Sequence, residues 1–360
     1  MRSVLVVVTR QIGDVLLTTP LIREARRIWP EAAIDVLGFE GTLGMLRGNP
    51  DVRELIATPV RPGLGGILRL ARRLWRRYDL VLVADPGDRA HLLGWLAAKR
   101  RSGLVPPEGR SNWLKTRALQ HSVRIAGDMG DVHVVQEKVE LLAPWRGQRP
   151  AQPLQLVGPA SAPLPQPLVR QLASGYIVMH TPSMWPYKQW PVDHFRELIA
   201  LLAMAGRQVV LTGGPDTGDR ETVEAMEGAA PPGMLVNAGV LDFNQVAGLI
   251  RGAALYIGPD TSVSHLAAAC GVPVLAIFGP TNPQRWAPWP AVPQWAPMQI
   301  HRATEVQTIG QVTLLQAPLP CVPCGKAGCE DHRQSRSDCL MMILPERVAA
   351  QALALVKREA

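Results

Sequence analysis

Several features are absent or rare in this chain of 360 residues. No stretch approaches the roughly 18 consecutive apolar residues that a membrane-spanning helix needs. Aromatic residues make up 5% and charged residues 19%, while 47% are hydrophobic, a composition typical of globular proteins. The apolar run between Arg2 and Arg10 is too short for a secretory signal peptide. We therefore expect a cytoplasmic protein without a transmembrane segment.

Two common nucleotide-binding signatures are also missing. No G-x-G-x-x-G follows the first apolar run, and no G-x-x-x-x-G-K-[ST] occurs anywhere in the chain. These absences argue against a nicotinamide-dependent dehydrogenase and against a P-loop nucleoside triphosphatase.

The positive charge is unevenly distributed. Residues 1–150 contain 24 lysines and arginines against 15 acidic residues, whereas residues 151–360 contain 14 against 15. A basic half indicates an anionic partner, such as a nucleic acid, a phosphorylated glycolipid or a membrane face, although solvated helix faces would look the same. The basic residues lack interleaved aromatics and any nucleic-acid recognition motif, so we expect no nucleic acid. The densest group is Arg61, Arg69, Arg72, Arg73, Arg76 and Arg77.

Apolar strand-like runs alternate with helical patterns along both halves. The first half has such runs at residues 4–8, 33–38, 54–57 and 79–85, and the pattern restarts at "GYIVMH" near residue 175. Continuous apolar strands between helices indicate parallel sheets covered on both faces. We therefore predict an α/β protein with two doubly wound, Rossmann-like domains facing a central cleft.

A proline-rich stretch separates the two halves. Six prolines fall between Pro150 and Pro167, a density that excludes a helix interior or a central strand. We predict a first domain at 1–150, a linker at 151–172, a second domain at 173–344, and a C-terminal helix at 345–360 that packs back on the first domain.

Asp14 lies in "TRQIGDVLLTTP", directly after the first apolar run. It is positioned either as an ordinary helix cap or as a base at the carboxyl end of a strand.

In the second half, the segment "YIGPDTSVSHLAAACG" predicts a strand, a tight turn and a helix that begins near Asp260. Helix N-termini suit phosphate groups, and Thr261 and Ser262 add hydroxyl donors, with His265 one turn further on. A capped helix with a buried histidine is the alternative.

Lys188 lies in "HTPSMWPYKQWP", a stiff loop of aromatic residues and prolines. It could neutralise a leaving diphosphate, or it could be a surface lysine over an aromatic cluster. Two further turns follow apolar runs: one contains Asp216, which we expect near a nucleoside, and the other precedes Trp286 and Trp289, which could stack on a base or a sugar or could simply pack.

Four of the five cysteines occur late, as Cys321, Cys324, Cys329 and Cys339. A thiolate quartet could hold Zn²⁺ or iron, with His332 as a substitute ligand, but the spacing is not that of a standard zinc ribbon. Reduced thiols are the alternative.

The ordered motifs "GDVLLTTPL", "YKQWP", "GGPD" and "GPDTSVSHLAAACGVPVLAIFGPT", with the tryptophans after them, resemble the ADP-heptose heptosyltransferases of lipopolysaccharide core assembly over nearly the whole chain. The segments "TPSMWPYKQW" and "LTGGPD" are most similar to the lipopolysaccharide heptosyltransferase III branch. The resemblance implies the GT-B fold, with the acceptor on the first domain and the nucleotide sugar on the second, and no required cofactor. Some protein-modifying relatives carry an iron bound by cysteines.

The resemblance also implies roles for individual residues. Asp14 would be the catalytic base of an inverting transfer, and Lys188 would bind the ADP phosphates. Donor-binding residues would be Thr181, Ser183, Lys188, Asp216, Leu241, Asp260, Thr261, Ser262 and His265. Ser262 departs from the glycine that is common in relatives, and its side chain narrows the approach of a phosphate to the backbone.

The implied partners are ADP-heptose and a lipid A core acceptor that carries Kdo and heptose, at the inner face of the inner membrane. Arg61, Arg69, Arg72 and Arg73 are the candidate acceptor-binding residues. Two alternatives remain open: a protein (autotransporter) heptosyltransferase of the same fold, and a non-catalytic, nucleotide-regulated binder of an anionic surface.

Overall fold

The computed structural model describes residues 1–110, 112–147, 153–290 and 300–357. The chain forms two compact units, Met1–Pro159 and Ala160–Ala360, which are described separately. Their boundary lies within the predicted linker, of which residues 151 and 152 are outside the described residues. One short helix, α8 (Gln166–Val169), interrupts this linker with a proline in its first turn, where the missing N–H is tolerated.

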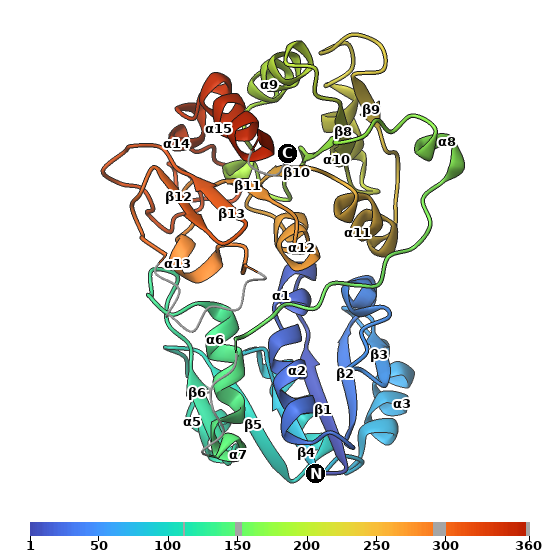
Figure 1. The fold of residues 1–360 in the computed structure, drawn as a ribbon. Coiled ribbons are helices and arrows are strands. Elements are labelled where there is room, and N and C mark those ends of the chain that lie inside the picture. Colours follow the sequence, from blue (N-terminus) through green and yellow to red (C-terminus); the bar gives the residue numbers. More distant parts are fainter. Residues whose placement is uncertain (111, 148–152, 291–299, 358–360) are drawn as a thin grey trace. The chain divides into compact units, whose positions relative to one another are not determined.

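The first unit is built on a sheet of parallel strands in the order β3-β2-β1-β4-β5-β6 (Figure 1). Its strands are β1 (Ser3–Val8), β2 (Ala33–Phe39), β3 (Glu54–Thr58), β4 (Leu80–Val83), β5 (Arg100–Val105) and β6 (His121–Arg124). Its helices are α1 (Ile12–Leu16), α2 (Thr19–Ile28), η1 (Leu43–Leu46), α3 (Leu64–Leu74), α4 (Asp88–Ala97), α5 (Asn112–Ala118), α6 (Val134–Val139), η2 (Glu140–Leu142) and α7 (Ala143–Arg146).

Burial explains the apolar runs of the first unit. Val4 to Val8 are all fully buried, so both faces of β1 are covered, as the unbroken run predicted. One face of the sheet packs against α3 and α4 through Leu74 and Leu93. The buried carboxylate of Asp35 on β2 is satisfied by Arg53 and by the hydroxyl of Tyr78 (2.7 Å), so it has a structural role.

The second unit contains a sheet in the order β12-β13-β11-β10-β7-β8-β9, parallel except for the antiparallel pair β12–β13. Its strands are β7 (Ile177–His180), β8 (Val209–Thr212), β9 (Leu235–Asn237), β10 (Leu255–Pro259), β11 (Val274–Ile277), β12 (Val306–Ile309) and β13 (Val312–Leu315). Its remaining helices are η3 (Pro186–Lys188), α9 (Val192–Met204), α10 (Thr217–Glu224), α11 (Phe243–Arg251), α12 (Ser262–Cys270), α13 (Pro283–Trp286), α14 (Asp338–Met341) and α15 (Pro345–Lys357).

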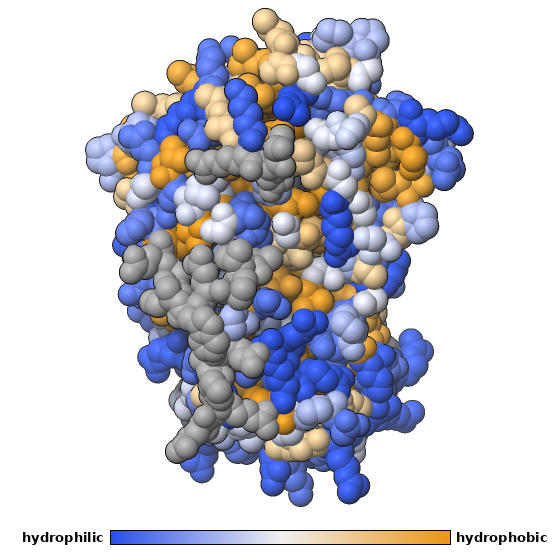
Figure 2. Space-filling model, in the orientation of Figure 1, coloured by the Kyte–Doolittle hydropathy of each residue, from blue (hydrophilic) through white to orange (hydrophobic). Residues whose placement is uncertain are grey.

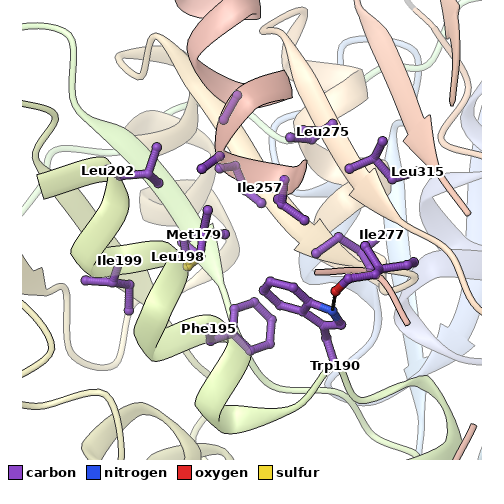
Figure 3. Close-up of a cluster of buried hydrophobic side chains, with 14 of the residues drawn as sticks. Met179, Trp190, Phe195, Leu198, Ile199, Leu202, Ile257, Leu275, Ile277 and Leu315 are labelled. Carbon is purple, nitrogen blue, oxygen red and sulfur yellow. Dashed lines mark hydrogen bonds between the residues drawn. The ribbon is translucent and has the colours of Figure 1, made fainter. Parts of the chain in front are cut away.

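The core of the second unit centres on Trp190 (Figure 3). The indole is fully buried and meets the ring of Phe195 edge to face, with centroids 4.8 Å apart. Its Nε1 donates to the carbonyl of Ile343 at 3.0 Å, so the polar end of the ring is satisfied. This bond anchors the chain just before α15 to the same core that Trp190 fills.

The helix α15 corrects one expectation. We predicted that the C-terminal segment packs back on the first domain, but its buried residues Val348, Ala352 and Val356 belong to the core of the second unit, where α15 contacts α9 and β10. Its apolar face completes the cover of that sheet. The last three residues of the predicted helix lie outside the described residues.

Each sheet has one point at which the strand order reverses. In the first unit the chain proceeds outwards from β1 in one direction and from β4 in the other, and in the second unit it does so from β7 and from β10, except that the edge strand β12 precedes β13. Crevices at the carboxyl ends of such strand pairs bind the ligands of open α/β sheets. The described helices include none that is both long and apolar enough to cross a bilayer.

Candidate active site

Asp14 lies at the strand-order reversal of the first unit, where β1 is followed by α1. The N-cap of α1 is Gln11, and Asp14 is in the first helical turn, so the alternative in which Asp14 caps the helix is wrong. Its carboxylate is therefore not bound to the N–H groups at the helix start, and an acidic residue in the first turn is stabilised by the helix dipole.

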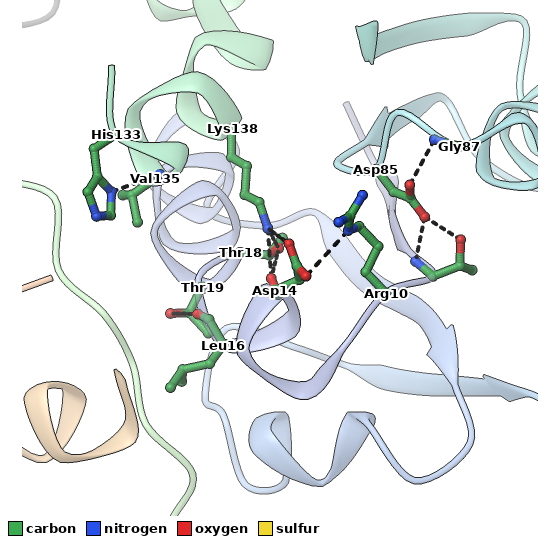
Figure 4. A network of polar contacts seen from close by, with 11 residues as sticks. Arg10, Asp14, Leu16, Thr18, Thr19, Asp85, Gly87, His133, Val135 and Lys138 are labelled. Carbon is green, nitrogen blue, oxygen red and sulfur yellow. Dashed lines mark hydrogen bonds and ion pairs between the residues drawn. The ribbon is translucent and has the colours of Figure 1, made fainter. Parts of the chain in front are cut away.

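Two cations hold Asp14 (Figure 4). The Nε of Arg10 donates to Oδ2 at 3.3 Å, and the Nζ of Lys138 lies 3.9 Å from Oδ1. Lys138 also donates to the main-chain oxygen of Asp14 at 2.7 Å and to the hydroxyl of Thr18 at 2.9 Å. Lys138 on α6 thus holds in place both the main chain and the carboxylate of Asp14, a residue far from it in sequence.

The burial of the two partners differs. The side chain of Lys138 is 4% exposed, whereas that of Asp14 is 13% exposed. Burial is the largest influence on Lys138 and lowers the pKa of its amine to about 8, with the field of Asp14 opposing this shift. The outward group of this pair is the carboxylate.

A second carboxylate, Asp85, follows β4 at the same reversal point. It is buried and accepts from the N–H (3.1 Å) and hydroxyl of Thr9 and from the N–H of Gly87 at 2.8 Å. Its bonds join the ends of β1 and β4 (Figure 4), so Asp85 shapes the edge of the sheet while Asp14 remains the accessible carboxylate.

In the second unit, Lys188 and Asp260 form an ion pair across the corresponding reversal point. Lys188 ends η3 after β7, Asp260 follows β10, and Nζ donates to Oδ2 at 2.6 Å. Here the lysine side chain is 23% exposed and the aspartate 7%. The outward group of this pair is the amine.

The surroundings of Asp260 keep it ionised despite its burial. Burial alone would raise the pKa of its carboxyl, but Lys188, Thr281 and His265 together outweigh that influence and lower the pKa. The ionised carboxylate in turn orients the Lys188 amine. Thr281, in the turn after β11, was not among the residues that we selected from the sequence.

The helix start after β10 forms as predicted, with Thr261 as the N-cap of α12 and Ser262 as its first residue. His265 is buried one turn further on. Near the end of β7, Thr181 is fully buried, and its hydroxyl has no hydrogen-bond partner among the described residues. Ser183 is half-buried and donates to the carbonyl of Trp185 at 3.3 Å.

The remaining donor-site candidates lie further along the same sheet edge. Asp216 is the exposed N-cap of α10 after β8, and half-buried Leu241 follows β9. Trp289 is 7% exposed, so the structure favours packing of this side chain over stacking on a ligand. Trp286 is half-buried, with the guanidinium of Arg285 5.8 Å from its ring centroid.

The candidate acceptor-binding arginines are all exposed on or near α3. Arg73 is paired with Glu54 at 2.7 Å, whereas Arg61, Arg69 and Arg72 have no ion-pair partner among the described residues. Hydrophilic residues form much of the visible surface of this unit (Figure 2).

The late cysteines do not form the metal centre that we considered. Within the described parts of the chain, no group of three or more histidine, cysteine or acidic side chains is arranged to hold a metal ion. Cys321, Cys324, Cys329 and Cys339 are free, and burial raises the pKa of the Cys339 thiol to about 12. His332 pairs with Glu330 at 2.8 Å instead.

Three comparisons place this geometry among known proteins. The sequence profile of glycosyltransferase family 9 (heptosyltransferase) matches residues 67–304. Lipopolysaccharide heptosyltransferase 3 of Escherichia coli is 29% identical over 290 residues, 77% of this chain and 83% of that protein.

Two solved structures share the fold. The ADP-heptose lipopolysaccharide heptosyltransferase II of E. coli superposes with a TM-score of 0.73 at 22% identity, covering 99% of both chains. The structure of the E. coli heptosyltransferase WaaC with ADP superposes with a TM-score of 0.71 at 21% identity, covering 98% of this chain and 99% of that one.

Two doubly wound α/β units, with the fold of the solved heptosyltransferases, are the architecture of the GT-B class. Within that class, the chain belongs to glycosyltransferase family 9, the heptosyltransferases. This confirms the family that the sequence motifs indicated, and a heptosyltransferase 3 is among the relatives.

Proposed function

We propose that this enzyme transfers heptose, with inversion, from ADP-heptose to an inner-core sugar of lipopolysaccharide at the inner face of the inner membrane. Its similarity to lipopolysaccharide and ADP-heptose heptosyltransferases supports the donor and the pathway. The observation that carries the mechanism is the accessible carboxylate of Asp14, held between Lys138 and Arg10.

Asp14 is the general base of this proposal. An acceptor hydroxyl attacks the anomeric carbon of the donor, its proton passes to a carboxylate oxygen of Asp14, and ADP departs from the opposite face of the sugar. Because Lys138 and Arg10 bind Asp14 from its own unit, the carboxylate is held in a defined orientation. A positioned base contributes about 10²- to 10⁴-fold to such a reaction.

Lys188 and the start of α12 stabilise the departing diphosphate. The Lys188 amine is partly exposed and oriented by Asp260. The free N–H groups of α12, with the hydroxyls of Thr261 and Ser262, are suited to an anion. A buried carboxylate repels phosphate, so we assign Asp260 to positioning Lys188. Thr181, Ser183, His265, Asp216 and Leu241 remain the proposed contacts to the rest of the donor, with Leu241 against the adenine.

The arginines near α3 are the proposed contacts to the acceptor. A lipid A core that carries Kdo and heptose presents carboxylates and phosphates, to which guanidinium groups bind strongly. Arg61, Arg69 and Arg72 are better placed for this role than Arg73, because Arg73 is already paired with Glu54.

The substitution Asp14→Asn tests the proposed base. It removes the proton acceptor and keeps the shape, so we expect kcat to fall by about 10²- to 10⁴-fold while ADP binding, measured by calorimetry, stays unchanged. Glu40→Gln is the matched control, because Glu40 is an exposed carboxylate that follows β2 at the same edge of the sheet. Turnover of the Asp14 variant at the control's rate would refute the assignment.

The acceptor is tested separately by mass spectrometry of lipopolysaccharide from strains with and without the gene. We expect the deletion strain to lack one core heptose. If the deletion strain instead keeps an intact core while a protein loses its heptose, the acceptor is a protein. Failure of the purified enzyme to bind ADP-heptose would refute both acceptors in favour of a non-catalytic role.

A further inference from the structure

The first unit exposes apolar side chains that its own core does not use. Six of them lie on α3, directly after it and on α4, with exposed fractions between 44% and 82%: Leu64, Ile67, Leu68, Trp75, Leu92 and Trp95. The helices α3 and α4 contact each other, so these residues form one region, which we name the α3–α4 apolar surface. A neighbouring group of exposed apolar residues on a folded domain marks an interaction site.

The apolar stripe of α3 is wider than the part of it that the core covers. Leu70 and Leu74 face the core of the unit. Ile67, three residues before Leu70, continues this stripe, and Leu64 and Leu68 lie along its edge, yet all three are exposed. Arg69, Arg72 and Arg73 lie on the remaining side of the helix. The core of the unit needs only the covered part of the stripe, so the exposed part requires another explanation.

Two tryptophans and an arginine join the C-terminal end of α3 to α4. The guanidinium of Arg76 lies 5.6 Å from the ring centroid of Trp75 and 5.7 Å from that of Trp95. The backbone N–H of Arg76 donates to the carbonyl of Leu96 at 3.0 Å, so the turn after α3 is bound to α4. Tryptophan and arginine together are typical of groups at the level of lipid headgroups, where the ring is half in apolar surroundings and the cation remains solvated.

The opposite end of α3 is also fixed to α4. Arg89 on α4 donates to the carbonyls of Pro59 (2.8 Å) and Val60 (2.6 Å), in the segment that leads into α3. The surface is therefore preformed by bonds at both ends.

We propose that the α3–α4 apolar surface docks the enzyme on an anionic phospholipid bilayer, with its leucine and tryptophan side chains in the headgroup region and the neighbouring arginines on lipid phosphates. Charge favours this occupant over a second copy of the chain. Two copies joined through this surface would bring Arg61, Arg69 and Arg72 of each copy together without acidic partners, which is repulsive. A basic helix with an exposed apolar stripe is suited to an interface plane.

The test is co-sedimentation of the full chain with vesicles of phosphatidylethanolamine and phosphatidylglycerol, and with vesicles of phosphatidylcholine alone. We expect binding to the anionic vesicles, weaker binding at high salt and little binding to the neutral ones. The double substitution Leu68→Ser/Trp75→Ser should reduce partitioning by about tenfold or more. Met204→Ser/Val240→Ser removes equally exposed apolar side chains of the second unit and should leave partitioning unchanged.

A second measurement places the surface in the bilayer. The pair Trp75→Phe/Trp95→Phe keeps the apolar character, so these variants should still bind while brominated lipids quench much less of the intrinsic fluorescence. Unchanged quenching, or equal loss of binding in the Met204/Val240 control, would overturn the proposal. Absence of vesicle binding together with a dimer that the Leu68/Trp75 variant abolishes would assign the surface to a second copy. Neither vesicle contains a sugar acceptor or donor, so the result does not depend on the proposed transferase activity.

Discussion

The two units contain the same kind of ion pair, a lysine with an aspartate, but in opposite arrangements. Each places a lysine and an aspartate at its strand-order reversal. In the first unit the lysine is buried (Lys138) and the aspartate faces outwards (Asp14), whereas in the second the aspartate is buried (Asp260) and the lysine faces outwards (Lys188). In each pair the buried partner orients the outward one. In the proposed mechanism, one unit provides the base and the other the cation of a nucleotide-sugar transfer.

Removing the outward cation should have the largest effect on this comparison. Lys188→Met deletes the charge that we propose stabilises the leaving diphosphate, so we expect kcat to fall by about 10²- to 10³-fold and ADP affinity to weaken. Steady-state kinetics and calorimetry measure both. Lys326→Met, at an exposed lysine of the same unit, is the control. Equal activity of the two variants would mean that the exposed amine of the pair has no chemical role.

Removing the buried cation should have a smaller effect, because Lys138 acts through Asp14. We expect Lys138→Met to lower kcat by about 10- to 100-fold with little change in KM, since a misplaced base loses rate rather than substrate affinity. Lys99→Met, at an exposed lysine of the first unit, provides the matched control. A change confined to KM would assign Lys138 to substrate binding instead of positioning.

The buried amine should also leave a pH signature on stability. Because burial lowers the pKa of Lys138 to about 8, from a usual value of 10.5, the unfolded chain binds more protons than the folded chain between these pH values. The free energy of unfolding that this group contributes therefore rises with pH across that window. Urea unfolding of the wild type and of Lys138→Met should show the wild type gaining stability relative to the variant from about pH 8 to about pH 10. A difference that is constant with pH would contradict a buried, charged Lys138.

The smallest effect is expected at Arg10. Its side chain is 41% exposed and lies 3.3 Å from Asp14, and exposed ion pairs contribute little. Arg10→Gln should change kcat by roughly twofold to fivefold, less at high salt. A loss as large as that of Lys138→Met would show that the exposed cation, and not the buried one, controls the base.

The elements with a strong local pattern were predictable from sequence. The runs at β1, β4, β10 and β11 are continuous and largely apolar because both of their faces are buried, and this is visible without tertiary information; β2 is interrupted only by the buried Asp35. The strands that escaped prediction lack such a run. β5 begins with two arginines and contains Ser102 and Gly103, and β12 and β13 form a short antiparallel hairpin around Gly310, which has a φ of +58°.

The residues of the candidate site also divide into those that the sequence could predict and those that it could not. Asp14, Lys188 and Asp260 follow strands closely in sequence, so their place at the carboxyl edge of a sheet could be predicted. Lys138 could not, because it reaches Asp14 from α6, 124 residues away, and carries no motif. The four late cysteines show the converse, since a suggestive spacing did not lead to a metal-binding arrangement among the described residues.

The sequence by itself determined the alternation of strands and helices, the two units, the turns that carry Asp14, Lys188 and Asp260, and through its motifs the family. These features depend on local periodicity and on residues adjacent to strand ends. Only the tertiary structure decided which member of each ion pair is buried, where α15 packs, and which apolar side chains of α3 and α4 remain exposed. Burial depends on residues that are distant in sequence and meet only in the fold, and burial decides which charged groups can meet a substrate.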